Sequence, residues 1–334
     1  MSVRTKLAII ILLGIAALLI APFAGPRWIS PSEIFGAASS SSAFGAAGLA
    51  NPERVFWELR VPRVILAWLC GATLGLCGML FQALFRNPLA EPTMLGVSSG
   101  ASFGAALCIY AGWSFSLFGA EGMTVCAFAG ALLCVAALHA SSRPDDPNGV
   151  ALLLAGVAFN FFFSSLVMIL QYVGDYHDSF RLLRWTLGGI QAIGIGEAIG
   201  LFPAFALAAA VSVFHAGELD LMLCGPEIAI ARGVALGRTR VVLFLSVSFC
   251  VAMCVAFCGP IAFVGLMVPH LCRMMVGVPH LRLSIASAAF GGAFLTLCDT
   301  AARTLWAPIE LPVGIITSFL GAPFFLWLLS RRRV

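Results

Sequence analysis

Charged side chains are scarce in this sequence. Of its 334 residues only 10% are Asp, Glu, Lys or Arg, whereas 61% are hydrophobic, and the mean hydropathy is +1.02. About a quarter of the residues of a soluble protein are charged, so the composition predicts an integral membrane protein. No polar interval is long enough to form its own core. We therefore expect one transmembrane domain over residues 1–334, which must take its energy from a partner or an ion gradient.

The sequence also lacks paired cysteines. It has 11 Cys but no C-x-x-C pair, and most of them stand singly inside apolar runs. A buried free cysteine behaves as a small hydrophobic residue. The spacing thus predicts packing roles and offers no metal site, and nothing in the sequence predicts a cofactor or a nucleic-acid partner.

Long apolar segments dominate what is present. Ten of them are close to the length that crosses a hydrocarbon core of about 30 Å, although two are short or interrupted by Gly and Pro. The first resembles a signal peptide, with APFA as a possible cleavage site, but a retained first helix is expected in so hydrophobic a chain. The fold class predicted is an all-α polytopic membrane protein with about ten transmembrane helices. The segments are Leu7–Phe23, Val64–Leu84, Met94–Ala111, Thr124–Leu138, Val150–Tyr172, Ile195–Phe214, Val241–Phe257, Ile261–Met275, Leu283–Ala302 and Leu311–Leu329.

Basic residues give an orientation. An even number of spans places both termini on one side, and Arg4 and Lys6 at the start agree with the Arg331–Arg333 run at the end. With the termini inside, twelve of the 19 basic residues are cytoplasmic, as the positive-inside rule requires. We expect a multi-pass protein of the inner (plasma) membrane, surrounded by lipid, with both termini in the cytoplasm.

A polar interruption, residues 216–240, divides the chain near its middle. It reads AGELDLMLCGPEIAIARGVALGRTR and is predicted to be a loop outside the bilayer. Within it, Pro226 to Val234 could form one short amphipathic helix. Such a helix at the membrane surface is what a soluble motor protein could grip, so we interpret the loop as a coupling element.

A second interruption, FRNPLAEPTMLGVSSGAS at residues 85–102, breaks a hydrophobic run. Irregular backbone at membrane depth is tolerated where it lines a cavity or is buried in protein. This indicates a constriction with Asn87 and Leu89 facing the pathway, but Asn87-Pro88 is equally typical of an ordinary turn. Asn160, in the fifth span, is either a pathway residue or a packing residue.

A weak internal repeat links this region to a later one. At an offset of 181, Cys77-Gly78 and Pro88 fall on Cys258-Gly259 and Pro269. The two stretches would cross the membrane in opposite directions, as the inverted repeats of transporters do.

Five motifs give a resemblance to a known family. RVPR, LFQALFRNPLAEPTMLGVSSGAS, ALLLAGVAF, GPIAFVGLMVPHLCR and ELPVGIITSFLGAPFFLWLL occur in this order between residues 60 and 329. They resemble the iron-chelate and vitamin B12 permease family, the membrane subunits of type II ATP-binding-cassette importers. The resemblance implies ten helices per chain, a homodimer with a second permease copy, a cytoplasmic ATPase dimer and a periplasmic substrate-binding protein. It also implies alternating-access import of a ferric siderophore, haem or cobalamin, with no covalent catalysis by this chain.

The resemblance also assigns residues. CGPEIAIARGV resembles the family's ATPase-coupling segment, with Gly225, Glu227, Ala229 and Gly233 matching, whereas Pro226 and Arg232 depart from the pattern. Basic residues that meet the binding protein in the family correspond here to Arg60, Arg63 and Arg303. An alternative for Arg303 is a pair with Asp299, four residues earlier on the same helix face.

Two rival functions are weaker. An ion-coupled secondary transporter would need ionisable groups at mid-membrane depth, and Asp299 is the only acid well inside a span. A membrane enzyme would need a nucleophile–base pair or a metal triad, and neither is evident. His270, Tyr172, Tyr176 and His177 are better explained by structural and external-loop roles than by proton transfer or haem ligation.

Overall fold

The part of the chain that the structure describes contains ten principal helices. The computed structural model describes residues 2–35, 52–117, 119–141, 150–192 and 194–331. All ten apolar segments of the sequence correspond to helices in this part of the chain, with boundaries that differ by a few residues. The helices are α1 (Val3–Ile20), α4 (Val61–Leu84), α5 (Val97–Tyr110), α6 (Gly122–Ser141), α7 (Val150–Val173), α9 (Gly196–Phe214), α12 (Leu236–Cys258), α13 (Val264–Val276), α14 (His280–Thr304) and α15 (Val313–Arg331).

Length separates these helices into two groups. Among the described residues, 8 helices are long and apolar enough to cross a membrane, one of them running without a break from Pro52 to Leu84. The other two, α5 with 14 residues and α13 with 13, are apolar but shorter. The prediction of an all-α, multi-pass membrane protein is confirmed, with α5 and α13 as the two short members.

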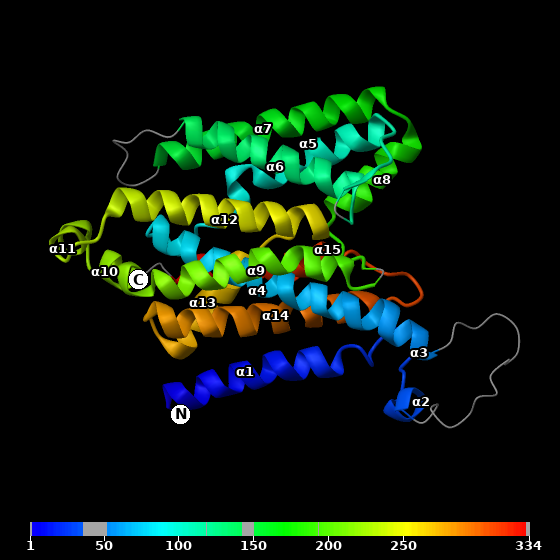
Figure 1. The fold of residues 1–334 in the computed structure, drawn as a ribbon, viewed down its shortest axis with the longest axis horizontal. Coiled ribbons are helices and arrows are strands. Elements are labelled where there is room, and N and C mark those ends of the chain that lie inside the picture. The colour runs from blue at the N-terminus through cyan, green and yellow to red at the C-terminus, as the bar shows by residue number, and fades with distance from the viewer. Residues whose placement is uncertain (1, 36–51, 118, 142–149, 193, 332–334) are drawn as a thin grey trace, which may run out of the picture.

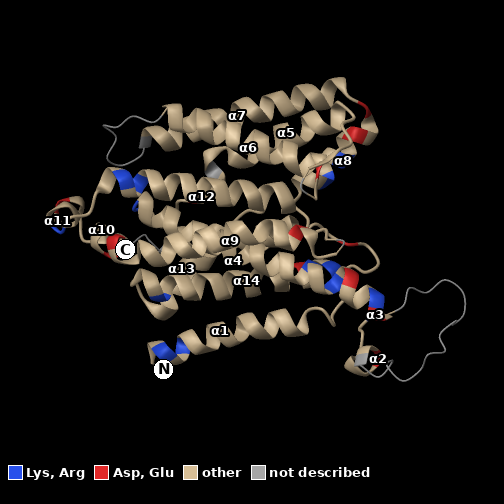
Figure 2. Cartoon of the chain, viewed as in Figure 1, with Lys and Arg blue, Asp and Glu red and all other residues tan. Residues whose placement is uncertain are grey.

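The helices run roughly parallel to one long axis, so the molecule has two ends (Figure 1). We call them the α11 end, which carries the start of α1 and the short helices α10 (Ala216–Leu223) and α11 (Pro226–Ala231), and the α8 end, which carries α8 (Tyr176–Thr186). Figure 2 shows charged residues gathered at these two ends and almost none between them. This distribution fits a bundle whose middle lies in hydrocarbon.

Helix α4 lies at the centre of the bundle, and 89% of the residues in its most apolar stretch are buried. It packs against α9, α12, α13 and α14, whereas α1 lies on the outer side of α14 and α5, α6 and α7 form a group beyond α12 (Figure 1). Close approach of α4 and α14 depends on small residues: a Cβ on Gly71 would overlap the carbonyl oxygen of Gly291, and one on Gly75 would lie 2.6 Å from that of Ser287. This is the small-residue packing that membrane helices use.

The short helices occur in two similar settings. Helix α4 is followed by α5 and α12 is followed by α13, and the two pairs run in opposite directions (Figure 1). This arrangement is what the sequence repeat predicts. The residue correspondence is imperfect, however, because Gly78 lies inside α4 whereas Gly259 follows the end of α12.

Small elements cap the α8 end. They include α2 (Pro31–Phe35), α3 (Pro52–Val55), a π-helical turn at Phe56–Arg60 (η2) and a hairpin of β1 (Ser116–Leu117) and β2 (Ala120–Glu121). At the start of α2, the backbone N–H of Ser30 donates to Glu33 at 2.8 Å and that of Glu33 donates to Ser30 Oγ at 3.3 Å, a capping box. The bond from the Ser30 N–H, with Arg27 nearby, lowers the pKa of Glu33 below its ordinary value.

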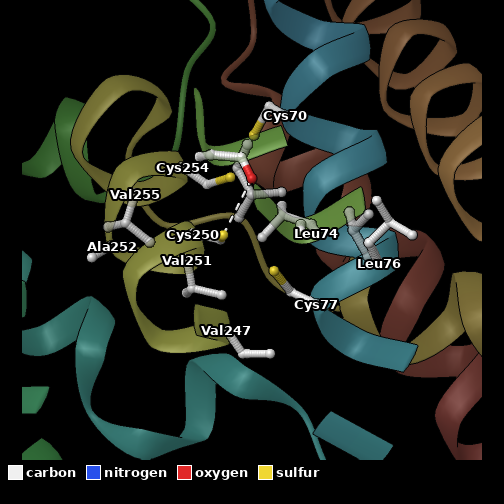
Figure 3. Close-up of a cluster of buried hydrophobic side chains, with 14 of the residues drawn as sticks. Cys70, Leu74, Leu76, Cys77, Val247, Cys250, Val251, Ala252, Cys254 and Val255 are labelled. Carbon is white, nitrogen blue, oxygen red and sulfur yellow. Dashed lines mark hydrogen bonds between the residues drawn. The ribbon is translucent and has the colours of Figure 1, made fainter. Parts of the chain in front are cut away.

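Cysteines contribute to the contact between α4 and α12. Figure 3 shows Cys70 and Cys77 of α4 near Cys250 and Cys254 of α12, among Leu74, Val247 and Val251. All four thiols are free and buried, and Cys250 Sγ donates to the Ala204 carbonyl oxygen at 3.2 Å. They pack as small hydrophobic residues, as the sequence predicts for the cysteines of apolar runs.

Candidate coupling, gate and docking regions

Helix α11 has only six residues and lies between two glycines. Gly225 precedes it with φ +122°, and Gly233 follows it with φ +86°, backbone regions that favour glycine. The N–H of Gly233 donates to the Ile230 carbonyl at 2.9 Å and that of Val234 to the Ala229 carbonyl at 2.9 Å, which is a Schellman motif. The two glycines therefore define where α11 begins and ends, and the helix stops at Ala231, before the predicted limit of Val234.

The surface of α11 is apolar as well as charged. Ala229 is fully buried, whereas Ile228 and Ile230 are 48% and 61% exposed. Glu227 and Arg232 are also exposed. Exposed isoleucines beside charged residues at the end of a membrane bundle form a surface suited to a protein partner.

Residues 216–240 were predicted to form a loop with one short helix, but the structure has a second helix there, α10. Its Leu219 and Met222 are buried against the bundle. Asp220 accepts hydrogen bonds from the backbone N–H of His280 at 2.9 Å and pairs with its Nδ1 at 2.6 Å, at the start of α14. Helix α10 is thus anchored to the start of α14.

A second tie joins α10 to α12. The Thr239 hydroxyl donates to Glu218 Oε2 at 2.8 Å, and Thr239 is buried in the first turn of α12. Helix α10 is therefore tied to both α12 and α14.

The connection from α4 to α5 begins with a tight turn. Arg86 has φ +49°, and Asn87 Oδ1 accepts the backbone N–H of Leu89 at 3.0 Å. The turn interpretation of Asn87-Pro88 is therefore correct. Asn87 is nevertheless exposed and Leu89 half-buried, so a gate role for them stays a prediction.

Beyond this turn the chain folds back against the start of α13. Glu91, 5% exposed, accepts the backbone N–H of Phe263 at 2.7 Å, and Gln82 Nε2 reaches the Gly265 and Leu266 carbonyls at 3.4 and 3.3 Å. Phe263 itself has φ +67°, a left-handed conformation that is unfavourable for a bulky residue. The carboxylate thus satisfies a donor at the beginning of a short helix.

The same connection reaches α7. After the 3₁₀ turn Pro92–Leu95 (η3), Gly96 has φ +76° and lies so close to α7 that a Cβ would be 3.1 Å from the Asn160 backbone nitrogen. Asn160 lies well away from both ends of α7, so α5, which begins beside it, starts at a similar depth along the bundle. The side chain of Asn160 is exposed. The pathway role of Asn160 stays a prediction.

At the α8 end, Asp299 links α14 to α4. Arg63 of α4 donates to both its carboxylate oxygens at 3.0 to 3.2 Å, and Arg303 Nε is 3.1 Å from Oδ2. Arg63 also donates to Glu310 Oε2 at 2.7 Å, just before α15. Asp299 and Arg303 are 1% and 3% exposed, so this is a buried network, and the predicted Asp299–Arg303 pair is confirmed.

Arg60 and Arg303 also hold the segment after α1. Arg60 donates to the carbonyl oxygens of Phe23 at 3.0 Å and Arg27 at 2.7 Å, and Arg303 donates to that of Ala24 at 3.3 Å. Arg60 is only 9% exposed. The three arginines predicted to dock a binding protein thus lie together, but their guanidinium groups are occupied inside the chain.

Comparison with known proteins then assigns the family. The sequence matches the FecCD transport family over residues 10–331. The chain belongs to this family.

Relatives in the FecCD family differ in what they carry. The hemin transport system permease protein of Yersinia pestis is 38% identical over 84% of this chain and 84% of its own length. The vitamin B12 import system permease protein of Yersinia enterocolitica is 34% identical over 97% and 91%. A solved inward-facing structure of a metal-chelate type ABC transporter is 30% identical and covers 98% of this chain and 99% of its own, with a TM-score of 0.81. The fold is therefore that of type II ABC importer permeases.

Several contacts in this FecCD protein were beyond the reach of sequence analysis. The pairs Asp220–His280, Glu218–Thr239 and Glu91–Phe263 join residues separated by 60, 21 and 172 positions. No motif marks them. Only the unusual presence of Glu91 and Asp220 among apolar residues could have drawn attention to these positions.

Proposed function

We propose that this chain is the membrane subunit of an ATP-driven importer for a metal chelate and works with a second copy of itself. The α11 end would face the cytoplasm and hold an ATPase dimer, and the α8 end would face a substrate-binding protein. Family membership, the bundle fold and the charged ends support this proposal.

The observation that carries it is the anchored coupling segment. An exposed apolar surface on α11 (Ile228 and Ile230) is joined through α10 to α14 by the Asp220–His280 contact. Helix α14 has 25 residues, roughly 37 Å at about 1.5 Å per residue, and carries Asp299 near its other end. A displacement of α11 by an ATPase could thus be transmitted to the opposite face, as alternating access requires.

For docking, the geometry favours Arg63 among the predicted arginines. Its Nη1 is paired with Glu310, whose side chain is 49% exposed, so an acidic residue of a binding protein could compete for it. Arg60 and Arg303 would act beneath the surface by holding residues 22–27 in place. The connection at residues 85–96, with Asn87 and Leu89, would gate the pathway together with Asn160 of α7.

The rival, an ion-coupled transporter, is less well supported. Its candidate acid from the sequence, Asp299, is paired with Arg63 and Arg303, so its charge is already compensated. We propose a ferric siderophore, haem or cobalamin as the substrate, and only family membership supports this choice.

The coupling proposal is tested by isolating the tagged chain in mild detergent from cells that make the whole system. Replacing Ile228 and Ile230 with Asp places charges on the apolar surface of α11 and should release the ATPase. The control Leu305→Asp alters a residue that is 63% exposed at the other end, and should retain it. If the unaltered chain, the α11 variant and the Leu305→Asp control all recover the same amount of ATPase, α11 is not the ATPase-binding surface.

A further inference from the structure

A polar pocket at the α8 end is not explained by coupling, gating or docking. It has a volume of about 470 Å³ and lies between α8, the β1–β2 hairpin, the start of α9 and the end of α12. A second pocket of about 520 Å³ adjoins it, sharing Glu121, Met123 and Arg181. Each volume falls within the range of about 300 to 1,000 Å³ of small-molecule sites. The polar side chains lining the first pocket include Glu121, Arg181, Arg184, Gln191 and Glu197.

The charges in this pocket are largely without partners. Within the described parts of the chain, Arg184 and Glu121 make no side-chain hydrogen bond or ion pair, and Arg181 reaches only Asp178, at 3.6 Å. Glu197 Oε2 is buried and accepts no hydrogen bond from any described residue. A buried acceptor without a donor is unfavourable, so a ligand that supplies the donor would gain affinity from this contact.

The pocket is also held in shape. Leu182 is fully buried and seats α8, and the hydroxyls of Ser179 and Tyr110 are 2.9 Å apart, which ties α8 to α5. The backbone N–H of Gly189 donates to the Cys258 carbonyl at 2.9 Å and closes the junction with α12. Binding groups on a supported helix lose little freedom when a ligand binds.

We propose that this pocket is an entry subsite for chelates whose rim carries both anionic oxygens and amide N–H groups. Arg184 and Arg181, three residues apart on α8, would bind the anionic oxygens, since guanidinium groups pair well with carboxylates. Glu197 would accept an amide N–H. A chelate that lacks anionic oxygens leaves the two arginines unpaired, and one that lacks amide N–H groups leaves Glu197 unpaired. Sites built for hydrogen bonding discriminate strongly against such analogues. The inference rests on the proposed function, which brings substrate to the α8 end.

Three radioiron-labelled probes separate the two requirements. Ferric aerobactin carries carboxylates and amides, haemin carries carboxylates without amides, and ferrichrome carries amides without carboxylates. Flow dialysis measures their binding to the assembled, detergent-solubilised transporter. We expect ferric aerobactin to bind at least about tenfold more tightly than the other two, the effect of roughly one charge-assisted hydrogen bond.

Two variants should change this pattern in opposite ways. Arg184→Gln should weaken ferric aerobactin and haemin about tenfold and leave ferrichrome unchanged, whereas Glu197→Gln should weaken ferric aerobactin and ferrichrome and leave haemin unchanged. Arg54→Gln, at the same end but in an exposed pair with Glu58, is the control and should change none of them. Co-purification with the ATPase shows that each variant is folded.

The pocket assignment fails if the three probes bind with equal affinity, if ferric aerobactin does not bind, or if either variant affects all probes alike. These failures differ from a failure of the proposed function. A transporter that takes up any chelate with ATP but shows no probe preference would keep the importer assignment and lose only the subsite. Absence of ATP-driven uptake would instead remove the function itself.

Discussion

At the scale of single residues, the structure distinguishes surface charges from buried ones. Arg54 and Glu58 form an exposed pair, whereas Asp299, 1% exposed, is shared by two arginines from different helices. Exposed pairs contribute about 0–1 kcal/mol, but removing one partner from a buried network leaves uncompensated charge. The sequence predicts that Asp299 lies inside a span and offers a pair with Arg303, but it does not predict the contact with Arg63 of α4.

Replacing Asp299 with Asn should therefore destabilise the protein by about 3–5 kcal/mol, because Arg63 and Arg303 lose their shared carboxylate. Thermal unfolding of the purified chain in detergent measures the change. Glu58→Gln serves as the comparison and should cost less than about 1 kcal/mol. Similar melting temperatures for the two variants would show that the Asp299 network is not structural.

Arg63→Glu should lower the affinity for the substrate-binding protein about tenfold or more. The new carboxylate would repel the acidic residues proposed on the surface of the binding protein. The internal network complicates this test, so Arg60→Gln, which affects only the contacts beneath, is run alongside. Surface plasmon resonance on the reconstituted transporter gives both affinities. If the two variants bind equally well, Arg63 has no direct docking role.

At the scale of elements, the spans were predictable and the short helices were not. Apolar windows identify α1, α6 and α12 from composition alone, because each must cover a hydrocarbon core. Helix α10 was missed because Glu218 and Asp220 make its sequence look like a solvated loop, whereas both bind residues of distant helices. The three arginines predicted to dock a binding protein lie together in the structure, and their docking role stays a prediction. Two of them, Arg60 and Arg303, are buried and donate to carbonyl oxygens of residues 22–27, contacts that no motif specifies.

The close contact of α4 with α14 predicts that alanine is harmful at Gly71, whereas Gly237 of α12, outside this contact, serves as the comparison. Gly71→Ala should destabilise the bundle by about 1–3 kcal/mol, because the new Cβ would overlap the Gly291 carbonyl. Gly237→Ala, in the first turn of α12 with open space around it, should be neutral or stabilising by up to about 1 kcal/mol. Denaturation of both variants in the same detergent decides the matter, and equal effects would contradict the close packing.

Helix α11 depends on the backbone conformation at Gly233. Because φ there is +86°, Gly233→Trp should distort the end of α11 and reduce ATPase binding while membrane insertion continues. Membrane fractionation and co-purification measure the two properties separately. Full transport by this variant would show that the Schellman motif is not needed for coupling.

At the scale of the whole molecule, α14 connects the α11 end with the α8 end. Its start is bound to α10 through Asp220, and its last turns hold Arg63 and Arg303 through Asp299. Asp220→Asn should weaken this connection, so that the assembled transporter hydrolyses more ATP per chelate imported. An unchanged ratio would indicate that force passes through α12 instead.

ATP on a partner bound at α11 is proposed to drive import through this bundle. The direct test measures uptake of a radioiron-labelled chelate into vesicles that contain the purified transporter and its binding protein. We expect uptake with ATP at the α11 side and none with an ion gradient alone. Uptake driven by an ion gradient in the absence of ATP would contradict it and favour the secondary-transporter alternative.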